Sequence, residues 1–285
     1  MRVVIISMAP RAIEGFAQLL EALGHETAGV LTLRNSRRPQ NVSDAIEATP
    51  ARVDAVVVGS KERVAPLLRS YEPDLALCSG FSWKLDAEAL AVPRLGIVNG
   101  HPSLLPQLRG PNPFGWTIRS GSGEVGFTFH LMDEGLDTGP VLAQGTAPLE
   151  DDASMESVFD ALPALVADLL PKALARVEAG DRGDPQSEEG ASYAGLYEDE
   201  YAEIDWTQPA RAVHTQVRSW FLPTVSGIWG PLTTLDGERV RVLETKLVAG
   251  ASNGEPGTIL ERGEDGLLVQ CGDGAVRVLR TEPAS

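Results

Sequence analysis

The chain has 285 residues, a net charge of −16 and 43% hydrophobic residues, a composition typical of a water-soluble globular protein. It contains no run of about 18 apolar residues that could cross a membrane, and its acidic balance disfavours a polyphosphate partner such as nucleic acid. The two cysteines, Cys78 and Cys271, are far apart in the chain and predict neither a disulfide framework nor a metal site.

The first half of the chain alternates short apolar runs with amphipathic segments. The N-terminal run ends at Pro10 without a cleavage site, so we expect a buried strand and a cytoplasmic protein. Strands are expected at 2–7, 26–33, 54–58, 75–78 and 96–98, and helices at 11–23 and 63–70. This alternation predicts an α/β fold with a doubly wound, mostly parallel sheet, in which ligands bind beyond the carboxyl ends of the strands.

The second half of the chain contains a long helix and a β-rich region. Apolar residues from 158 to 173 share one helical face, and Gly180 is expected to end this helix. The polar, Gly- and Pro-containing stretch after it indicates a linker. A helix at 209–220 precedes five short strands, which predict a small β-barrel of oligonucleotide-binding type, at 230–235, 239–247, 257–260, 267–271 and 275–279. We expect domains at 1–185 and 203–285, joined by a linker at 186–202.

Three polar side chains predict acyl-transfer chemistry. Asn99 and His101 lie two residues apart at the end of a strand, so both point to the same face. Asp137 lies in an acidic, turn-rich loop between two strand candidates. An amide can stabilise a developing oxyanion, an imidazole can transfer a proton, and a carboxylate can set the pKa of that imidazole. We therefore expect catalysis by these residues with neither a metal nor a covalent intermediate.

Two sequence runs carry a resemblance to a known family. NGHPSLLP at 99–106, followed by MDEGLDTGPVL at 132–142, resembles the folate-dependent formyltransferases. The residues IDW at 204–206, GTI at 257–259 and GLLVQCGDG at 266–274 are similar to the C-terminal barrel domain of methionyl-tRNA formyltransferases. The resemblance covers most of the chain. It implies a Rossmann-like catalytic domain that moves a formyl group from 10-formyltetrahydrofolate to an amine.

The resemblance also implies roles for single residues. Asn99 matches the amide that holds the formyl oxygen, His101 the catalytic imidazole, and Asp137 the carboxylate that tunes it and relays a proton through water. Eight further positions are expected to bind the folate: Phe81, Trp83, Lys84, Leu85, Asp133, Glu134, Gly135 and Leu136. Five positions are expected to bind the acceptor: Ser103, Leu104, Leu105, Arg109 and Gly110.

The identity of the acceptor has alternatives. Members of the family formylate methionyl-tRNA or small amines such as amino sugars, and some release formate to water. The tRNA enzymes carry a long basic insertion where this chain has only RNSRRP at 34–39, and small residues where it has PNPF at 111–114. These departures and the negative net charge favour a small-molecule amine. Methionyl-tRNA formylation, hydrolysis to formate and folate binding without turnover are the alternatives.

The remaining histidines are not expected to take part in the chemistry. His25 and His130 have no partner pattern in the sequence, so a metal site lacks ligands. His214 shares a helix with apolar residues and is expected to be packed and partly buried. The run GSGEVG at 121–126 matches a dinucleotide-binding pattern, but it follows a helix and precedes a strand instead of the reverse, so we expect no nucleotide there.

Overall fold

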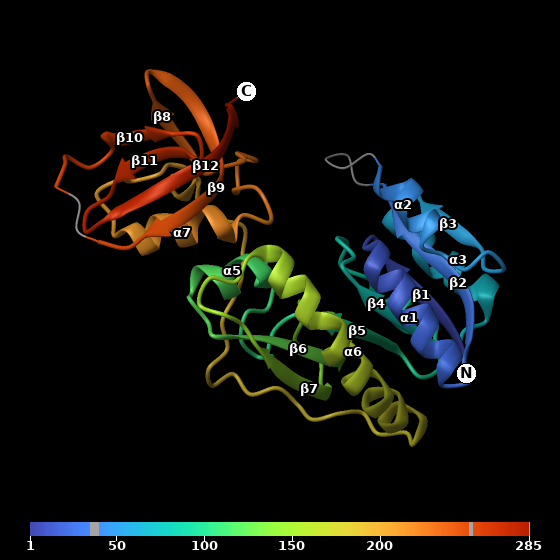
Figure 1. Ribbon diagram of the computed structural model, residues 1–285. Coiled ribbons are helices and arrows are strands. Elements are labelled where there is room, and N and C mark those ends of the chain that lie inside the picture. Colours follow the sequence, from blue (N-terminus) through green and yellow to red (C-terminus); the bar gives the residue numbers. More distant parts are fainter. Residues whose placement is uncertain (35–39, 251–252, 285) are drawn as a thin grey trace. The chain divides into compact units, whose positions relative to one another are not determined.

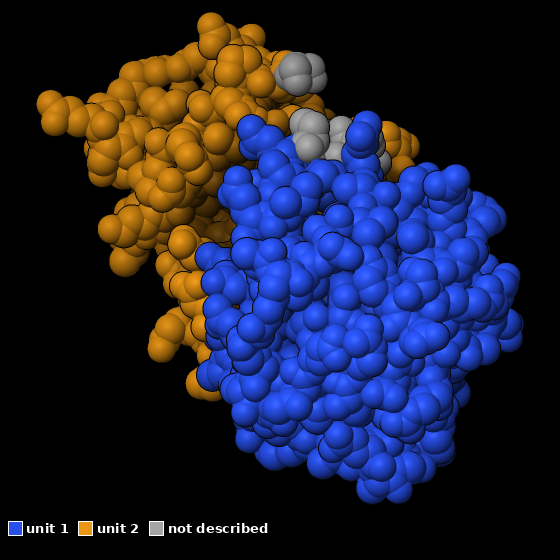
Figure 2. Space-filling model, turned by 90° about the vertical axis from the view of Figure 1, so that its right-hand side faces the viewer, with its two compact units in different colours: residues 1–110, 125–147, 161–193 blue, residues 111–124, 148–160, 194–285 orange. Residues whose placement is uncertain are grey.

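The computed structural model describes residues 1–34, 40–250 and 253–284 (Figure 1). Arg37 and Arg38 of the basic run therefore lie outside the described residues. The chain divides into two compact units, one of residues 1–110, 125–147 and 161–193, the other of residues 111–124, 148–160 and 194–285 (Figure 2). Neither unit is one continuous stretch of chain. The domain limits that the sequence suggests along its length stay a prediction.

A seven-stranded sheet forms the core of the first unit, with the strand order β3-β2-β1-β4-β5-β6-β7. Its strands are β1 (Arg2–Ser7), β2 (Glu26–Leu33), β3 (Ala55–Val58), β4 (Leu75–Ser79), β5 (Ile97–His101), β6 (Glu124–Leu131) and β7 (Val141–Pro148). The pairings among β1 to β5 are parallel, and β6 runs antiparallel to β5. The predicted α/β fold with a mostly parallel sheet is confirmed.

Helices cover this sheet and connect its strands (Figure 1). They are α1 (Pro10–Ala22), α2 (Asn41–Glu47), η1 (Lys61–Arg63), α3 (Val64–Tyr71), α4 (Ala87–Leu90) and most of α6 (Met155–Glu178). A further helix between β5 and β6, α5 (Pro113–Arg119), belongs to the second unit. Val4 and Ile6 of β1 pack into one cluster with residues of α3 and α4. Because side chains alternate along a strand, Val3 and Ile5 point to the opposite face. In the part of the chain that the structure describes, no helix has the length and apolar character needed to cross a membrane.

The second unit is built on a five-stranded antiparallel sheet with the order β10-β11-β12-β9-β8. It contains η2 (Asp199–Ala202), α7 (Ala210–Ser219), β8 (Leu232–Leu235), β9 (Glu238–Val248), β10 (Ile259–Gly263), β11 (Gly266–Gln270) and β12 (Ala275–Pro283). Val213 and Val217 of α7 share one apolar cluster with Val242 and Val276 of the sheet. The five short strands expected after the 209–220 helix are therefore confirmed.

Aromatic packing explains why two segments from the middle of the chain belong to the second unit. Phe114 of α5 lies 4.9 Å from Phe159 and 5.2 Å from Phe221, measured between ring centroids, and both contacts are edge-on. Phe159 and Phe221 are themselves 5.6 Å apart. Each aromatic side chain removes a large apolar area from water when it packs. Phe114, the last residue of the PNPF run at 111–114, thus lies on a helix and has a packing role.

His214 is a buried polar residue in the second unit, as the sequence suggested. Its Nε2 lies 2.7 Å from Asp152 Oδ1 and its Nδ1 lies 2.7 Å from Thr245 Oγ1. Burial lowers the pKa of His214, and the nearby charges of Arg218 and Arg211 lower it further. The hydrogen bond to Asp152 raises this pKa but does not reverse the decrease. The neutral ring thus connects α7 to β9 and to the loop that precedes α6.

We expect His214 to make the protein less stable in mild acid. Because the pKa of His214 is lowered by folding, the unfolded chain takes up the proton first as the pH falls below the ordinary histidine value of about 6.5. The contribution of the neutral His214 ring to the free energy of unfolding is complete above that pH. It is lost as the pH falls below that value. The melting temperature of His214→Gln, measured by calorimetry from pH 7.5 to pH 5.5, should fall less than that of the wild type. A parallel fall in both proteins would contradict this role.

Candidate active site

Asn99, His101 and Asp137 meet at the carboxyl end of β5. Asn99 and His101 are the third and fifth residues of this strand, and Asp137 lies in the loop between β6 and β7. Asn99 Nδ2 donates to Asp137 Oδ1 at 3.3 Å, and His101 Nδ1 lies 3.6 Å from Asp137 Oδ2. The structure therefore brings together the amide, the imidazole and the carboxylate that the sequence singled out.

Gly100 separates the two strand residues and points to the opposite face of the sheet. A Cβ atom at this position would lie 2.9 Å from Phe127 and 3.2 Å from Phe129. Both aromatic rings are on β6, and they pack edge to face. A larger residue would have to push these rings aside, at a typical cost of about 1–3 kcal/mol in stability. The Asn-Gly-His sequence thus places two candidate catalytic side chains on one face of the sheet and a closely packed glycine on the other.

Asp137 is held in place by its backbone and by its side chain. Its φ is 55°, a left-handed conformation that Asp tolerates better than most residues. Gly110 N–H donates to Asp137 Oδ2 at 2.9 Å, and Gln186 Nε2 donates to the Asp137 carbonyl at 2.8 Å. Burial alone would raise the pKa of the Asp137 carboxyl. Contact with His130, the charge of a protonated His101 and the Gly110 N–H together lower that pKa below its ordinary value.

His101 is buried, with 6% of its side chain exposed. Its Nε2 lies 2.9 Å from the Leu108 carbonyl oxygen, which can only accept, so this nitrogen carries a proton. The nitrogen that can exchange a proton is then Nδ1, which faces Asp137. Burial lowers the pKa of His101, opposed by the charge of Asp137 and by the bond to Leu108. His101 is thus neutral at neutral pH and lies beside a carboxylate.

His130 joins this group, although no sequence motif pointed to it. It lies on β6, directly opposite Asn99 in the antiparallel pairing. Its Nε2 is 3.1 Å from Asn99 Nδ2 and 3.7 Å from Asp137 Oδ1, and its side chain is 2% exposed. No local motif marks such a residue. Only the register of β5 against β6 could have identified it.

The residues expected to bind the folate after β4 differ in exposure. Phe81 and Trp83 are partly buried, and their rings pack edge to face with centroids 5.9 Å apart. Lys84 is exposed. Leu85 is 2% exposed and belongs to the hydrophobic core, so its side chain is used in packing and only its backbone could contact a ligand.

The acidic loop expected to bind the folate is exposed beside Asp137. Asp133, Glu134, Gly135 and Leu136 are all exposed, and Leu136 has 44% of its surface in contact with solvent. Asp133 Oδ1 accepts hydrogen bonds from Gly135 N–H at 2.9 Å and from Thr138 Oγ1 at 2.8 Å. Asp133 therefore shapes the turn that leads to Asp137.

The residues expected to bind the acceptor are mostly used within the protein. Ser103 Oγ donates to the Gln107 carbonyl at 2.6 Å, and Leu105 is 3% exposed. Leu104 is partly buried. Arg109 pairs with Glu188 at 3.2 Å and keeps only 11% of its side chain exposed. Of the five, Gly110 contacts the candidate site, through its hydrogen bond to Asp137.

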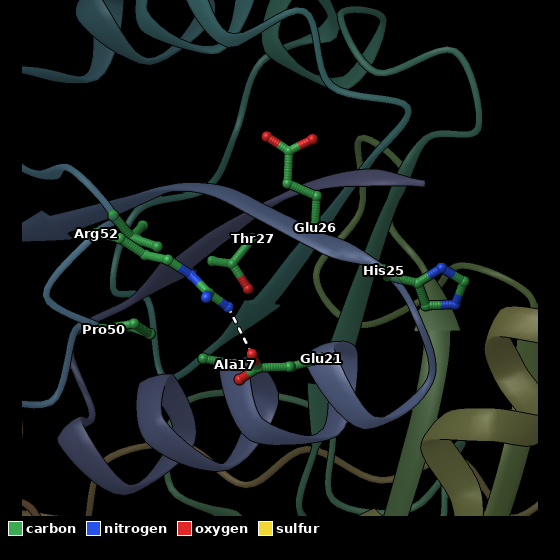
Figure 3. A pocket seen from close by; sticks show the side chains of 8 residues that line it. Ala17, Glu21, His25, Glu26, Thr27, Pro50 and Arg52 are labelled. Carbon is green, nitrogen blue, oxygen red and sulfur yellow. Dashed lines mark hydrogen bonds and ion pairs between the residues drawn. The ribbon is translucent and has the colours of Figure 1, made fainter.

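A separate cavity of about 250 Å³ lies at the amino-terminal end of β2, beside α1 (Figure 3). Its lining includes Glu26 and Thr27, which begin β2, and Arg52, which pairs with Glu21 at 2.6 Å. Ligands of parallel sheets bind at the carboxyl ends of the strands, and this cavity lies at the amino ends.

Among the residues that the structure describes, no group of three His, Cys, Asp or Glu side chains is arranged to hold a metal ion.

Comparisons with known proteins identify the family. A family model described as formyl transferase matches residues 1–174, and one described as formyl transferase, C-terminal domain, matches residues 197–285. A methionyl-tRNA formyltransferase from Sinorhizobium fredii is 33% identical, over 100% of this chain and 92% of the relative.

Solved structures share the fold. HypX from Aquifex aeolicus, solved in complex with tetrahydrofolic acid, has a TM-score of 0.74 and 21% identity, over 100% of this chain and 44% of HypX. A sugar N-formyltransferase from Shewanella sp FDAARGOS_354 has a TM-score of 0.65 and 21% identity, over 87% of this chain and 99% of its own. At this identity the likeness concerns the fold. The two family matches, together with the full-length relative, show that the chain belongs to the formyl transferase family and is a formyltransferase.

Proposed function

We propose that this enzyme moves a formyl group from 10-formyltetrahydrofolate to an amine, with Asn99, His101 and Asp137 as its catalytic residues. The observation that carries the proposal is that an amide N–H donor, at 3.3 Å, and a neutral imidazole, at 3.6 Å, both lie beside the carboxylate of Asp137. A folate donor would supply a formyl carbon bonded to nitrogen. Acyl transfer to an amine needs a donor for the carbonyl oxygen and a group that accepts the proton of the amine.

The arrangement of strands supports a folate site beside these residues. Cys78 of β4 pairs with Asn99 of β5 in parallel, so the loop after β4 begins next to the candidate catalytic residues. The backbone of 81–85 and the exposed loop 133–136 would hold the pterin, as the family resemblance implies. Because Leu85 is buried, we assign its part in this binding to its backbone.

Each of the three residues has a distinct role in the proposal. The Asn99 amide donates a hydrogen bond to the formyl oxygen as negative charge develops there. His101 accepts a proton at Nδ1, since its Nε2 is committed to the Leu108 carbonyl. Asp137 stabilises the imidazolium that results, because its Oδ2 lies 3.6 Å from that nitrogen.

We propose that the acceptor is methionyl-tRNA. Relatives of that name align with the whole chain at 33% identity, and the C-terminal domain family matches here as well. This proposal replaces the small-molecule acceptor that the sequence favoured, which becomes the second candidate.

One observation favours a small-molecule amine as the second candidate. The arginines in the described strands of the C-terminal sheet, Arg239, Arg241, Arg262, Arg277 and Arg280, all contact carboxylates. The paired groups leave little free positive charge for an RNA backbone, in a chain with a net charge of −16. Sugar N-formyltransferases also share the fold.

The proposed coupling of Asp137 to His101 predicts a change in titration. Asp137→Asn removes the negative charge that raises the pKa of His101, so this pKa should fall further below the ordinary value of about 6.5. Histidine NMR signals followed from pH 8 to pH 4 in wild type and variant would measure the change. A higher pKa of His101 in the variant would contradict the proposed coupling.

Substitution of the two strand residues should abolish transfer. Asn99→Ala removes the donor to the formyl oxygen and is expected to lower kcat about 100-fold to 1000-fold, and His101→Ala should lower it at least as much. Production of tetrahydrofolate in the presence of acceptor would be followed by absorbance. Lys172→Gln, at an exposed position on α6, serves as the control and should retain wild-type kcat. Normal turnover by either alanine variant would end the catalytic assignment.

The acceptor proposal predicts formylation of initiator tRNA charged with methionine. The rate at limiting tRNA should fall at least about tenfold between 50 and 200 mM salt, since phosphate contacts release counterions. Mass spectrometry would detect the formylated product, with nucleotide-linked amino sugars assayed in parallel. Transfer to an amino sugar but not to the tRNA would reject the tRNA proposal in favour of the second candidate. Formate release without any amine would indicate a hydrolase.

A further inference from the structure

The ring of His101 lies between two residues that share an unusual backbone conformation. Its Nε2 donates to the Leu108 carbonyl at 2.9 Å, and its Nδ1 lies 3.6 Å from Asp137 Oδ2. Both Leu108 and Asp137 have a φ of 55°, in the left-handed region. Residues other than glycine rarely adopt this conformation, and they keep it only where the surrounding structure holds them. Whatever holds these two residues therefore decides whether His101 keeps its partners.

One short segment of the first unit contacts both sides of the candidate site. This segment, residues 184–193, lies largely within the stretch that the sequence indicates as a linker, and we call it the strap. Asp184 exchanges two backbone hydrogen bonds with Val141 at the start of β7, each of 2.8 Å. At the other end, Tyr193 forms a bridge with Arg109 in the loop after β5. The strap is thus attached to the loops on both sides of His101.

Ser192 of the strap is bonded to the backbone on both sides of Leu108. Its Oγ accepts from the Leu108 N–H at 2.9 Å, and its carbonyl accepts from the Arg109 N–H at 2.9 Å. Its own N–H donates to the Pro106 carbonyl at 3.2 Å. A leucine has no polar side chain that could stabilise a left-handed backbone locally, as Asn or Asp can. The hydrogen bonds of Ser192 supply this restraint from outside the loop.

Gln186 of the strap is bonded to the backbone of Asp137. Its Nε2 donates to the carbonyls of Asp137 and Gly139, at 2.8 and 2.7 Å. Its Oε1 accepts from Arg109 Nε at 3.0 Å. Because arginine can only donate and a carbonyl can only accept, this orientation of the amide satisfies all three contacts. Gln186 thus fixes the piece of backbone from which the Asp137 carboxylate projects.

We propose that Gln186 and Ser192 are positioning residues, which act through Asp137 and Leu108 to set the place and the orientation of the His101 ring. Both act through other residues, since their hydrogen bonds go to the two loops and not to the imidazole. A small displacement of a group that transfers a proton can slow a reaction greatly. The effect on catalysis rests on the proposed function, whereas the restraint on His101 does not.

Substitutions in the strap test the effect on turnover. Gln186→Met keeps the length of the side chain without its hydrogen bonds or any new charge, and should lower kcat about 10-fold to 100-fold. Ser192→Ala removes one hydrogen bond and should lower kcat about twofold to tenfold, whereas Ser192→Thr keeps the hydroxyl and should recover most of the loss. Ser187→Ala is the matched control on the strap and should retain wild-type kcat, since the Ser187 hydroxyl accepts from the Glu189 N–H.

Two outcomes of these kinetics would overturn the inference. One is a Gln186→Met variant with wild-type kcat, and the other is a Ser192→Thr variant as impaired as Ser192→Ala. The melting temperature of each variant, measured by calorimetry, verifies that it is folded.

The titration of His101 separates a positioning role from a merely structural one. Burial lowers the pKa of His101, the charge of Asp137 and the Leu108 carbonyl raise it, and the charge of His130 lowers it. Loss of restraint on Asp137 or Leu108 should therefore lower the pKa of His101 further in Gln186→Met and in the Ser-to-Ala variant of the strap. The acid limb of the kcat–pH profile should move to lower pH with it. A loss of stability alone would leave this pKa unchanged.

NMR of the histidine signals measures this pKa without turnover, with the His101 signals assigned by their loss in His101→Gln. In an Asp137→Asn background, Gln186→Met should change the pKa no further, because the charge that it positions is already gone. An unchanged or higher pKa of His101 in Gln186→Met alone would overturn the inference, whatever its kcat. If the wild-type enzyme formylates no acceptor while this pKa falls as expected, the proposed function fails and the positioning role stands.

Discussion

Asn99 and His130 lie directly opposite each other across β5 and β6, and the antiparallel register that pairs them sets the geometry of the whole candidate site. A shift of one residue in a strand turns its side chains to the other face of the sheet. Gly100 helps to fix this register because the rings of Phe127 and Phe129 occupy the space beside it. The β6–β7 loop then brings Asp137 back beside Asn99. A shift in this register would therefore separate the Asn99 amide from both His130 and Asp137.

The charge balance of the site follows from this packing. A buried carboxyl without partners would have its pKa raised and would lose its charge. At Asp137 the surrounding donors reverse this outcome, while burial keeps the adjacent His101 neutral. The resting site therefore holds one negative charge next to an imidazole that can still take up a proton. Protonation of His101 at Nδ1 completes an ion pair over 3.6 Å, which makes His101 a better proton acceptor at the moment when an amine must release one.

Local patterns in the sequence predicted the strands well, because burial repeats at a fixed period within each element. The strands at 2–7 and 26–33 were predicted to the residue, and the spacing of Asn99 and His101 placed both on one face of β5. His130 was missed because its partner is 31 residues away and depends on strand pairing, which no local pattern encodes. The family resemblance named Leu85 and Ser103 as binding positions, but it could not tell that their side chains are buried. Burial is a property of the assembled chain, so such positions can offer a ligand only their backbone.

The magnitudes of the surface interactions decide how much weight the negative charge carries against an RNA acceptor. At physiological salt the field of exposed charges is largely screened beyond about 8 Å, so most of the net charge of −16 lies too far from any one contact surface to oppose RNA there. Arg262 and Arg280 are more than half exposed, and exposed ion pairs of this kind are worth only about 0–1 kcal/mol. A phosphate group can replace such a carboxylate at little cost, whereas the more buried Arg277 is held more firmly. Paired arginines on this sheet therefore count less against an RNA acceptor than their number suggests.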